Sequence, residues 1–169
     1  MIADVFTRTP LQGNQLAVFT DAQGLSAGEM QALAREMNFA ESVFVLPAEG
    51  EADARIRIFT PASELPFAGH PVLGTAVVLG DLRGLAVARL ETGLGLVPVQ
   101  LELEGDGVAF GRMEQPIPVP RPYERAGELL AALGVERSGL PVEAYPNGPL
   151  HVFVELESEE AVAALRPDM

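Results

Sequence analysis

A histidine at the start of an apolar helix is the side chain in this sequence best placed to do chemistry. Gly69, His70 and Pro71 lead into residues 72–79, which are almost wholly apolar, and Gly80 is the predicted stop. A helix that is apolar on every side is buried, so only its ends can reach a site. Its N-terminus presents free N–H groups beside the imidazole, and such an end favours a carboxylate or a phosphate. These residues therefore predict a binding site for a small acid.

The same histidine has a structural explanation, because the residue before a proline favours extended backbone and suits a helix cap. A cap that also faces the ligand would satisfy both explanations for His70. Asn14 follows Gly13 in a predicted turn, where asparagine tolerates positive φ, and its side chain could also line the site. Both residues are candidate binding residues, and the structural alternatives stay open.

A glutamate at the start of a predicted strand could act as an acid–base group or could simply be a solvated carboxylate. Glu41 precedes residues 42–46, but it is one of 24 acidic residues, and position alone predicts a solvated loop carboxylate. Proton transfer near neutral pH requires burial that raises the pKa of Glu41. Phe39 and Phe44 are the apolar neighbours expected to provide that burial.

Composition excludes several classes of site and partner. The 169 residues are 48% hydrophobic with a net charge of −13, which predicts a globular protein and disfavours nucleic acid or an anionic membrane as a partner. The absence of cysteine and lysine excludes disulfides, thiol catalysis and a lysine Schiff base. Two histidines are too few for most zinc sites, so we expect no metal. No apolar run reaches about 18 residues and no leader is recognisable, so we expect a soluble, cytoplasmic protein.

Alternation of apolar and polar residues predicts many strands and few helices. The clearest helix spans residues 25–38, where Ser26 and Glu29 form a capping box. Arg55 and Arg57 lie on one face of a predicted strand and are expected to be solvated. The predicted strands are 2–6, 16–19, 42–46, 54–58, 99–104 and 108–111, with one or two more between 87 and 97 and a turn at 105–107.

A proline-rich stretch divides the chain. Residues 115–122 contain alternating prolines, which enforce an extended path and cannot join the interior of a sheet. We therefore assign residues 1–114 to a first lobe, 115–122 to a linker and 123–169 to a partial second lobe. At about 47 residues, the last segment is near the size at which a core alone rarely suffices. Its predicted elements are a helix at 124–133, a strand at 151–156 and a short helix after Ser158.

A series of short motifs runs along essentially the whole chain, and their order is more specific than any one of them. They are Asp4-Val5-Phe6-Thr7, Gly13-Asn14, Leu16-Ala17-Val18, Leu33-Ala34-Arg35-Glu36-Met37-Asn38, Glu41-Ser42, Phe44-Val45, Arg57-Ile58-Phe59-Thr60-Pro61 and Glu64-Leu65-Pro66-Phe67-Ala68-Gly69-His70-Pro71, with weaker matches at Gln115-Pro116, Asn147-Gly148 and His151-Val152-Phe153-Val154. Together they resemble the PhzF-like isomerases, a family named for phenazine biosynthesis, within the diaminopimelate epimerase-like fold.

The resemblance implies an α+β fold with two similar lobes. Each lobe would be a curved mixed or antiparallel sheet wrapped around a buried central helix, here at about residues 70–80, and the second lobe would be incomplete in this chain. The family implies a cofactor-independent isomerase that moves a proton on a small cyclic carboxylic acid in the cleft between the lobes. Its members are commonly homodimers.

Carried over to this sequence, the resemblance makes Glu41 the general acid–base group. Gly69 and His70 would bind the substrate near its carboxylate, and the family's further site groups would lie beyond residue 169. Two functions follow. Either the chain is part of an isomerase that takes its second lobe from a longer polypeptide or a complementary chain, or it is a truncated or degenerate, non-catalytic member that binds a small acid or a partner. In both cases we expect an oligomer.

Overall fold

The computed structural model describes residues 1–105, 107–115 and 117–168. The chain forms two compact units, Met1–Gln115 and Pro116–Met169. The predicted turn residue Asp106 and the predicted linker residue Pro116 lie outside the described residues. The assignment of the units as a first lobe and part of a second lobe stays a prediction. Within the part of the chain that the structure describes, no helix is long and apolar enough to cross a bilayer.

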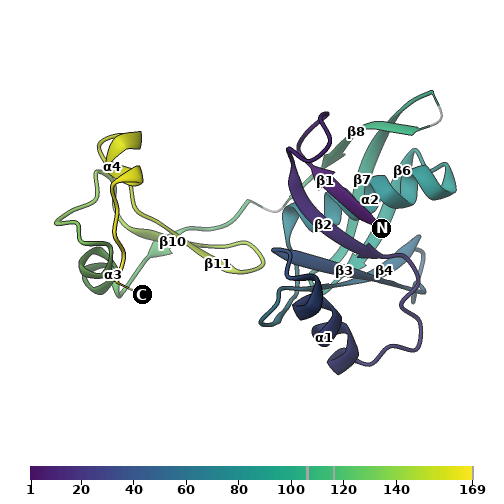
Figure 1. The fold of residues 1–169 in the computed structure, drawn as a ribbon, viewed down its shortest axis with the longest axis horizontal. Coiled ribbons are helices and arrows are strands. Elements are labelled where there is room, and N and C mark those ends of the chain that lie inside the picture. Colours follow the sequence, from purple (N-terminus) through teal and green to yellow (C-terminus); the bar gives the residue numbers. More distant parts are fainter. Residues whose placement is uncertain (106, 116, 169) are drawn as a thin grey trace. The chain divides into compact units, whose positions relative to one another are not determined.

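The first unit is built on one curved, mostly antiparallel sheet (Figure 1). Its described strands run in the order β1-β2-β3-β4-β6-β7-β8, and β5 pairs with β4. Two neighbouring pairs, β2 with β3 and β4 with β6, are parallel, which makes the sheet mixed. The strands are β1 (Ile2–Val5), β2 (Asn14–Phe19), β3 (Glu41–Leu46), β4 (Ala54–Phe59), β5 (Glu64–Leu65), β6 (Val87–Thr92), β7 (Gly95–Glu104) and β8 (Gly107–Met113).

The sheet wraps around a buried helix, α2 (Gly69–Arg83), which contacts strands from both ends of the sheet (Figure 1). This confirms the predicted α+β lobe with a curved sheet around a central helix. The predicted stop at Gly80 is wrong, because the helix continues past it and ends at Gly84, whose φ of 66° is left-handed. Gly80 instead permits close packing, since a Cβ there would lie 2.5 Å from Leu101 and 2.9 Å from Val108.

Alternate residues of the strands build a core on each face of the sheet. The larger core lies between the sheet and α2 and includes Val43, Ile58 and Val72, which are fully buried. The smaller core lies on the opposite face, where α1 (Ala27–Met37) packs and Phe44 is buried. The sheet therefore has an inner face toward α2 and an outer face toward α1.

The helix on the outer face has the predicted capping box. The Ser26 hydroxyl accepts the Glu29 N–H at 3.3 Å, and the Glu29 carboxylate accepts the Ser26 N–H at 2.8 Å. Asn38 ends the helix with a left-handed φ of 53°. Residues adjacent in sequence fix both ends, which explains why the sequence predicted this helix correctly.

The second unit contains a small antiparallel sheet in the order β11-β10-β9 and two short helices. The edge strand β9 (Arg121–Pro122) falls inside the predicted linker 115–122, and a sheet edge is where proline is tolerated. Ala144 is the one buried residue among those described in this unit, so this part has almost no core of its own. The remaining elements are α3 (Ala126–Leu133), β10 (Glu143–Pro146), β11 (Leu150–Phe153) and α4 (Glu159–Ala163).

Candidate active site

The predicted site residues lie at the starts of neighbouring elements. Asn14 is the first residue of β2, Glu41 is the first of β3, and Gly69 and His70 open α2. Strands β2 and β3 are parallel, with Leu16 opposite Glu41, so both begin at the same edge of the sheet. The structure therefore brings together side chains that are far apart in the sequence.

His70 lies between the other two side chains. Its Nε2 is 3.4 Å from Glu41 Oε2, and its Nδ1 is 3.3 Å from the amide Nδ2 of Asn14. The contact with Glu41 is too long for a good hydrogen bond. Nε2 and Oε2 are both buried, and neither has a hydrogen-bond partner among the described residues. These two atoms are therefore shielded from water and face each other without a second partner among the described residues.

Burial favours the uncharged form of both groups. It raises the pKa of Glu41 above the ordinary value, and it is the largest cause of the lowered pKa of His70. A hydrogen bond with the backbone of Gln15 partly offsets the effect on His70. The contact is therefore not a stabilising salt bridge, although the distance would allow one. A carboxyl group with a raised pKa is suited to accept and return a proton near neutral pH.

The N-terminus of α2 opens beside this pair. The helix begins at Gly69 with Ala68 as its N-cap, so the structural alternative, in which His70 caps the helix, does not hold. No side chain caps this end, and its first turn holds no acidic residue. Because Pro71 has no N–H, the free donors of the first helical residues are those of Gly69 and His70. A carboxylate bound there would meet the positive end of the helix dipole.

The predicted apolar environment of Glu41 is partly wrong. Side chains alternate along β3, so Glu41 is on the inner face with Val43, whereas Phe44 is on the outer face. Phe44 stacks on Phe19 with ring centroids 4.6 Å apart and does not contribute to the site. The burial of Glu41 comes from the inner face beside α2. Phe39 precedes the strand and is half-buried, and its contribution stays a prediction.

The Gly13-Asn14 turn also differs from its prediction. Asn14 begins a strand, and it is not among the described residues with positive φ. Gly13 is required for space, because a Cβ there would lie 2.7 Å from the carbonyl oxygen of Val5. This close approach of β2 to β1 sets the position of Asn14.

The arginines of β4 are ion-paired away from the site. Arg57 makes two contacts of 2.6 Å with the carboxylate of Glu64, and Arg55 pairs with Glu49. The prediction that the arginines are simply solvated is therefore incomplete, since both have carboxylate partners. Within the described residues, no group of three or more histidine or acidic side chains could hold a metal ion.

Phe6 is a neighbour of the site that the sequence did not reveal. It follows β1 with a φ of 66°, which is unusual for a bulky residue, and its side chain is 74% exposed. Its ring centroid lies 6.4 Å from that of His70. No sequence signal predicts positive φ at phenylalanine, and the motif containing Phe6 indicated only the family.

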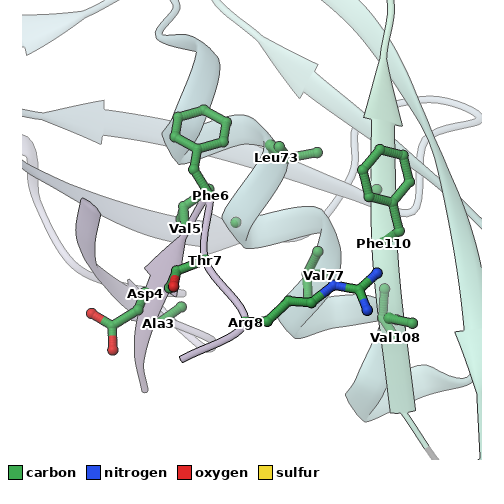
Figure 2. A pocket seen from close by; sticks show the side chains of 13 residues that line it. Ala3, Asp4, Val5, Phe6, Thr7, Arg8, Leu73, Val77, Val108 and Phe110 are labelled. Atoms are coloured by element: carbon green, nitrogen blue, oxygen red, sulfur yellow. The ribbon is translucent and has the colours of Figure 1, made fainter. Parts of the chain in front are cut away.

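A pocket of about 460 Å³ lies between the edge strands β1 and β8, with α2 behind it (Figure 2). Its described lining does not include Asn14, Glu41 or His70, so it adjoins the candidate active site without containing it. The buried acid–base pair remains the candidate active site, because it has the perturbed titratable groups that chemistry requires. The labelled residues of the pocket include Asp4, Phe6, Arg8, Leu73, Val77 and Phe110.

Comparison with known proteins shows the family. The sequence matches PhzC-PhzF, described as phenazine biosynthesis-like protein, over residues 3–169. The chain belongs to this family. A trans-2,3-dihydro-3-hydroxyanthranilate isomerase of Pseudomonas aeruginosa is 53% identical over 168 residues, which cover 99% of this chain and 60% of that protein. The chain spans about 60% of the length of this isomerase and of its namesakes from Pseudomonas fluorescens and Pseudomonas chlororaphis.

Solved structures agree on the fold of this family member. A predicted epimerase from Pseudomonas aeruginosa is 34% identical, with a TM-score of 0.87 over 99% of this chain and 62% of the other. A PhzF family protein of Bacillus anthracis is 32% identical with a TM-score of 0.78, covering 99% and 58%. A probable proline racemase from Agrobacterium radiobacter, 15% identical with a TM-score of 0.59 over 84% and 48%, shares the fold alone. These matches confirm the diaminopimelate epimerase-like fold.

Proposed function

We propose that this chain carries the acid–base carboxylate of a cofactor-independent isomerase that moves a proton on a small cyclic carboxylic acid. The observation that supports this function is the half-buried Glu41, whose pKa is raised and which lies 3.4 Å from His70 at the uncapped start of α2. Relatives named trans-2,3-dihydro-3-hydroxyanthranilate isomerase, 50–53% identical over 168 residues, favour the same reaction class. Their named substrate is the first compound to test.

In this proposal, Glu41 both takes and returns the proton. The ionised carboxylate accepts a proton from a ring carbon, and the electron pair of that C–H bond delocalises into the adjacent unsaturated system of the substrate. The resulting carboxylic acid then gives the proton to another carbon on the same face of the ring. Nothing is oxidised or reduced, so the step balances without a cofactor.

The start of α2 would bind the substrate carboxylate. The free N–H groups of Gly69 and His70 point along the positive end of the helix dipole, which favours an anion. This would hold the ring beside Glu41, and the raised pKa of that carboxyl supports proton transfer near neutral pH. Proton transfer also requires exclusion of water. We therefore propose that a second lobe, from a longer polypeptide or a complementary chain, covers the site, and that the assembly is a homodimer or a pair of unlike chains.

The test follows hydrogen exchange into the substrate. The protein, with any companion that co-purifies with it, is incubated with trans-2,3-dihydro-3-hydroxyanthranilate in D₂O, and deuterium uptake and product are measured by NMR. Glu41→Gln should lower both rates by about 10²–10⁴-fold, the usual range for loss of a general acid–base group. Glu36→Gln is the matched control, because Glu36 is an exposed glutamate of α1 and should have no effect.

Two outcomes would count against this function. Equal exchange rates in wild type and Glu41→Gln would remove Glu41 from the mechanism. Binding of the acid without exchange, in a preparation that native mass spectrometry shows to be a homo-oligomer of this chain alone, would favour the non-catalytic alternative. That alternative is a small-acid-binding or partner-binding member of the family.

A further inference from the structure

The amide of Asn14 contacts the ring nitrogen of His70 that points away from Glu41. Asn14 Nδ2 lies 3.3 Å from His70 Nδ1, and 56 residues separate the two in sequence. Asn14 is held there as the first residue of β2, where it pairs with Val5 of β1. The contact therefore depends on the fold and joins the edge of the sheet to the start of α2.

With the Asn14 –NH₂ facing Nδ1, the chemistry of the amide favours one position for the ring proton of His70. An amide –NH₂ can only donate, so the Nδ1 that it contacts must accept with its lone pair. A neutral imidazole has one donor and one acceptor nitrogen, so Nε2 carries the hydrogen. Nε2 is the atom 3.4 Å from Glu41 Oε2, and both atoms are buried without another partner among the described residues. The N–H of His70 is thus directed toward the Glu41 carboxylate.

The opposite arrangement places the ring hydrogen of His70 on Nδ1 and leaves a lone pair on Nε2. If the Asn14 amide were rotated, its oxygen would accept from Nδ1–H, and the Gln15 backbone that hydrogen-bonds the ring would favour the same proton position. Nε2 would then present a lone pair to Glu41 Oε2 at 3.4 Å. Two buried acceptors facing each other are unfavourable whenever Glu41 is ionised, because neither can be satisfied by the other. The first arrangement is therefore favoured while Glu41 is ionised, whereas a protonated Glu41 would donate its O–H to Nε2 and favour the second.

We propose that Asn14 is a positioning residue that, while Glu41 is ionised, holds His70 as its neutral Nε2–H tautomer with that hydrogen directed at Glu41. Asn14 then acts through His70 and does not bind the substrate directly, in contrast to its sequence-based assignment. His70 serves as a hydrogen-bond donor, and Glu41 remains the single group that carries the proton. The catalytic significance of this arrangement rests on the proposed function, whereas the tautomer itself does not.

The tautomer can be read directly by NMR of the 169-residue chain with ¹⁵N-labelled histidine at pH 8. The chain has two histidines, so a His151→Gln variant assigns both sets of ring signals. The expected result is a His70 ring with Nε2 protonated and Nδ1 unprotonated. A wild-type ring with the hydrogen on Nδ1 would overturn the proposal.

Substitution of Asn14 tests whether its amide sets the tautomer of His70. In Asn14→Asp, which has nearly the same size, the carboxylate can only accept, so Nδ1 should gain a hydrogen and its signal should move to the protonated range. In Asn14→Ala the donor is lost, and His70 should shift toward a mixture of tautomers. Asn38→Asp makes the same chemical change at the end of α1 and should leave His70 unchanged. An unaltered Nε2–H pattern in both Asn14 variants would refute the role of Asn14.

Kinetics separate this proposal from the proposed function. In an active assembly, Asn14→Asp should lower kcat by about 10²-fold or more with a smaller change in KM, because a wrong histidine tautomer costs up to about 10⁴-fold in serine proteases. If Glu41→Gln has no effect on exchange while the Asn14 variants change the tautomer, the proposed function fails and the positioning role stands. If Glu41→Gln abolishes exchange but Asn14→Asp leaves kcat unchanged, the positioning role fails for catalysis.

Discussion

Substitution of Gly74 tests how α2 is held against the site. Gly74 lies one turn after His70, and a Cβ there would be 2.7 Å from Val5 Cγ2 and 2.8 Å from Leu16 Cδ2. Ordinary contacts between carbon atoms are about 3.5–4 Å, so the helix and the strands would have to separate by up to about 1 Å. Val5 is opposite Asn14 in the β1–β2 pair, so the separation would fall beside the Asn14–His70 contact.

Two effects of opposite sign decide the stability of Gly74→Ala. Replacing a glycine inside a helix by alanine lowers the free energy of the folded state by about 1 kcal/mol. Forcing an extra carbon into a packed core raises it by about 1–3 kcal/mol. Leu16 is 0% and Val5 is 7% exposed, so neither has open space to turn into. We therefore expect a net loss of up to about 2 kcal/mol in the free energy of unfolding.

Urea denaturation followed by circular dichroism measures this loss. The control is Gly28→Ala in α1, where a Cβ would meet only Ser26 Oγ at 3.9 Å, so alanine should stabilise by up to about 1 kcal/mol. Both tyrosines, Tyr123 and Tyr145, lie in the second unit, so tyrosine fluorescence should be unchanged in either variant. If Gly74→Ala stabilises the protein as much as Gly28→Ala does, the inferred close packing of α2 against β1 and β2 is wrong.

Three further changes test the rest of the first unit. Ser26→Ala removes the capping box and should cost about 1 kcal/mol in thermal denaturation, and no loss would mean that the cap is not stabilising. Glu41→Gln should stabilise the fold at neutral pH. The pKa of Glu41 is raised by burial, so its contribution to stability is fully present below the unfolded value near 4.5 and is lost as pH rises through the folded pKa. Urea midpoints of this variant and wild type should therefore converge at low pH and diverge toward neutral pH, and a constant difference would contradict the shift. Phe6→Ala should change stability by less than about 0.5 kcal/mol, since its ring is 74% exposed, while weakening the binding of cyclic acids measured by titration calorimetry.

Features that depend on neighbouring residues could be predicted from the sequence. The capping box of Ser26 and Glu29 spans four positions, and the structure has it as predicted. The sequence also allows the face on which each residue of β3 lies to be predicted. Glu41 and Phe44 are three residues apart, and side chains alternate along a strand, so they must lie on opposite faces. The prediction that Phe44 buries Glu41 is wrong because this alternation places Phe44 on the opposite face of the strand.

Features that depend on distant packing could not be predicted. A glycine after an apolar run indicates a helix end, but Gly80 is needed because Leu101 and Val108 pack against it from strands that come later in the chain. The parallel pairing of β2 with β3 has no local signal, and it is this pairing that places Asn14 near Glu41. The left-handed backbone of Phe6 likewise follows from the path of the chain after β1.

The placement of the site residues at the first positions of β2, β3 and α2 has a consequence for how the family can diversify. The buried core is built from the interiors of these elements, so exchanging a side chain at their first positions disturbs little of the packing on which folding depends. New chemistry can therefore arise on this lobe without a loss of stability that would first have to be compensated. Substitution at Asn14, Glu41 or His70 would therefore change the chemistry of the site while the helix and sheet beneath stay the same.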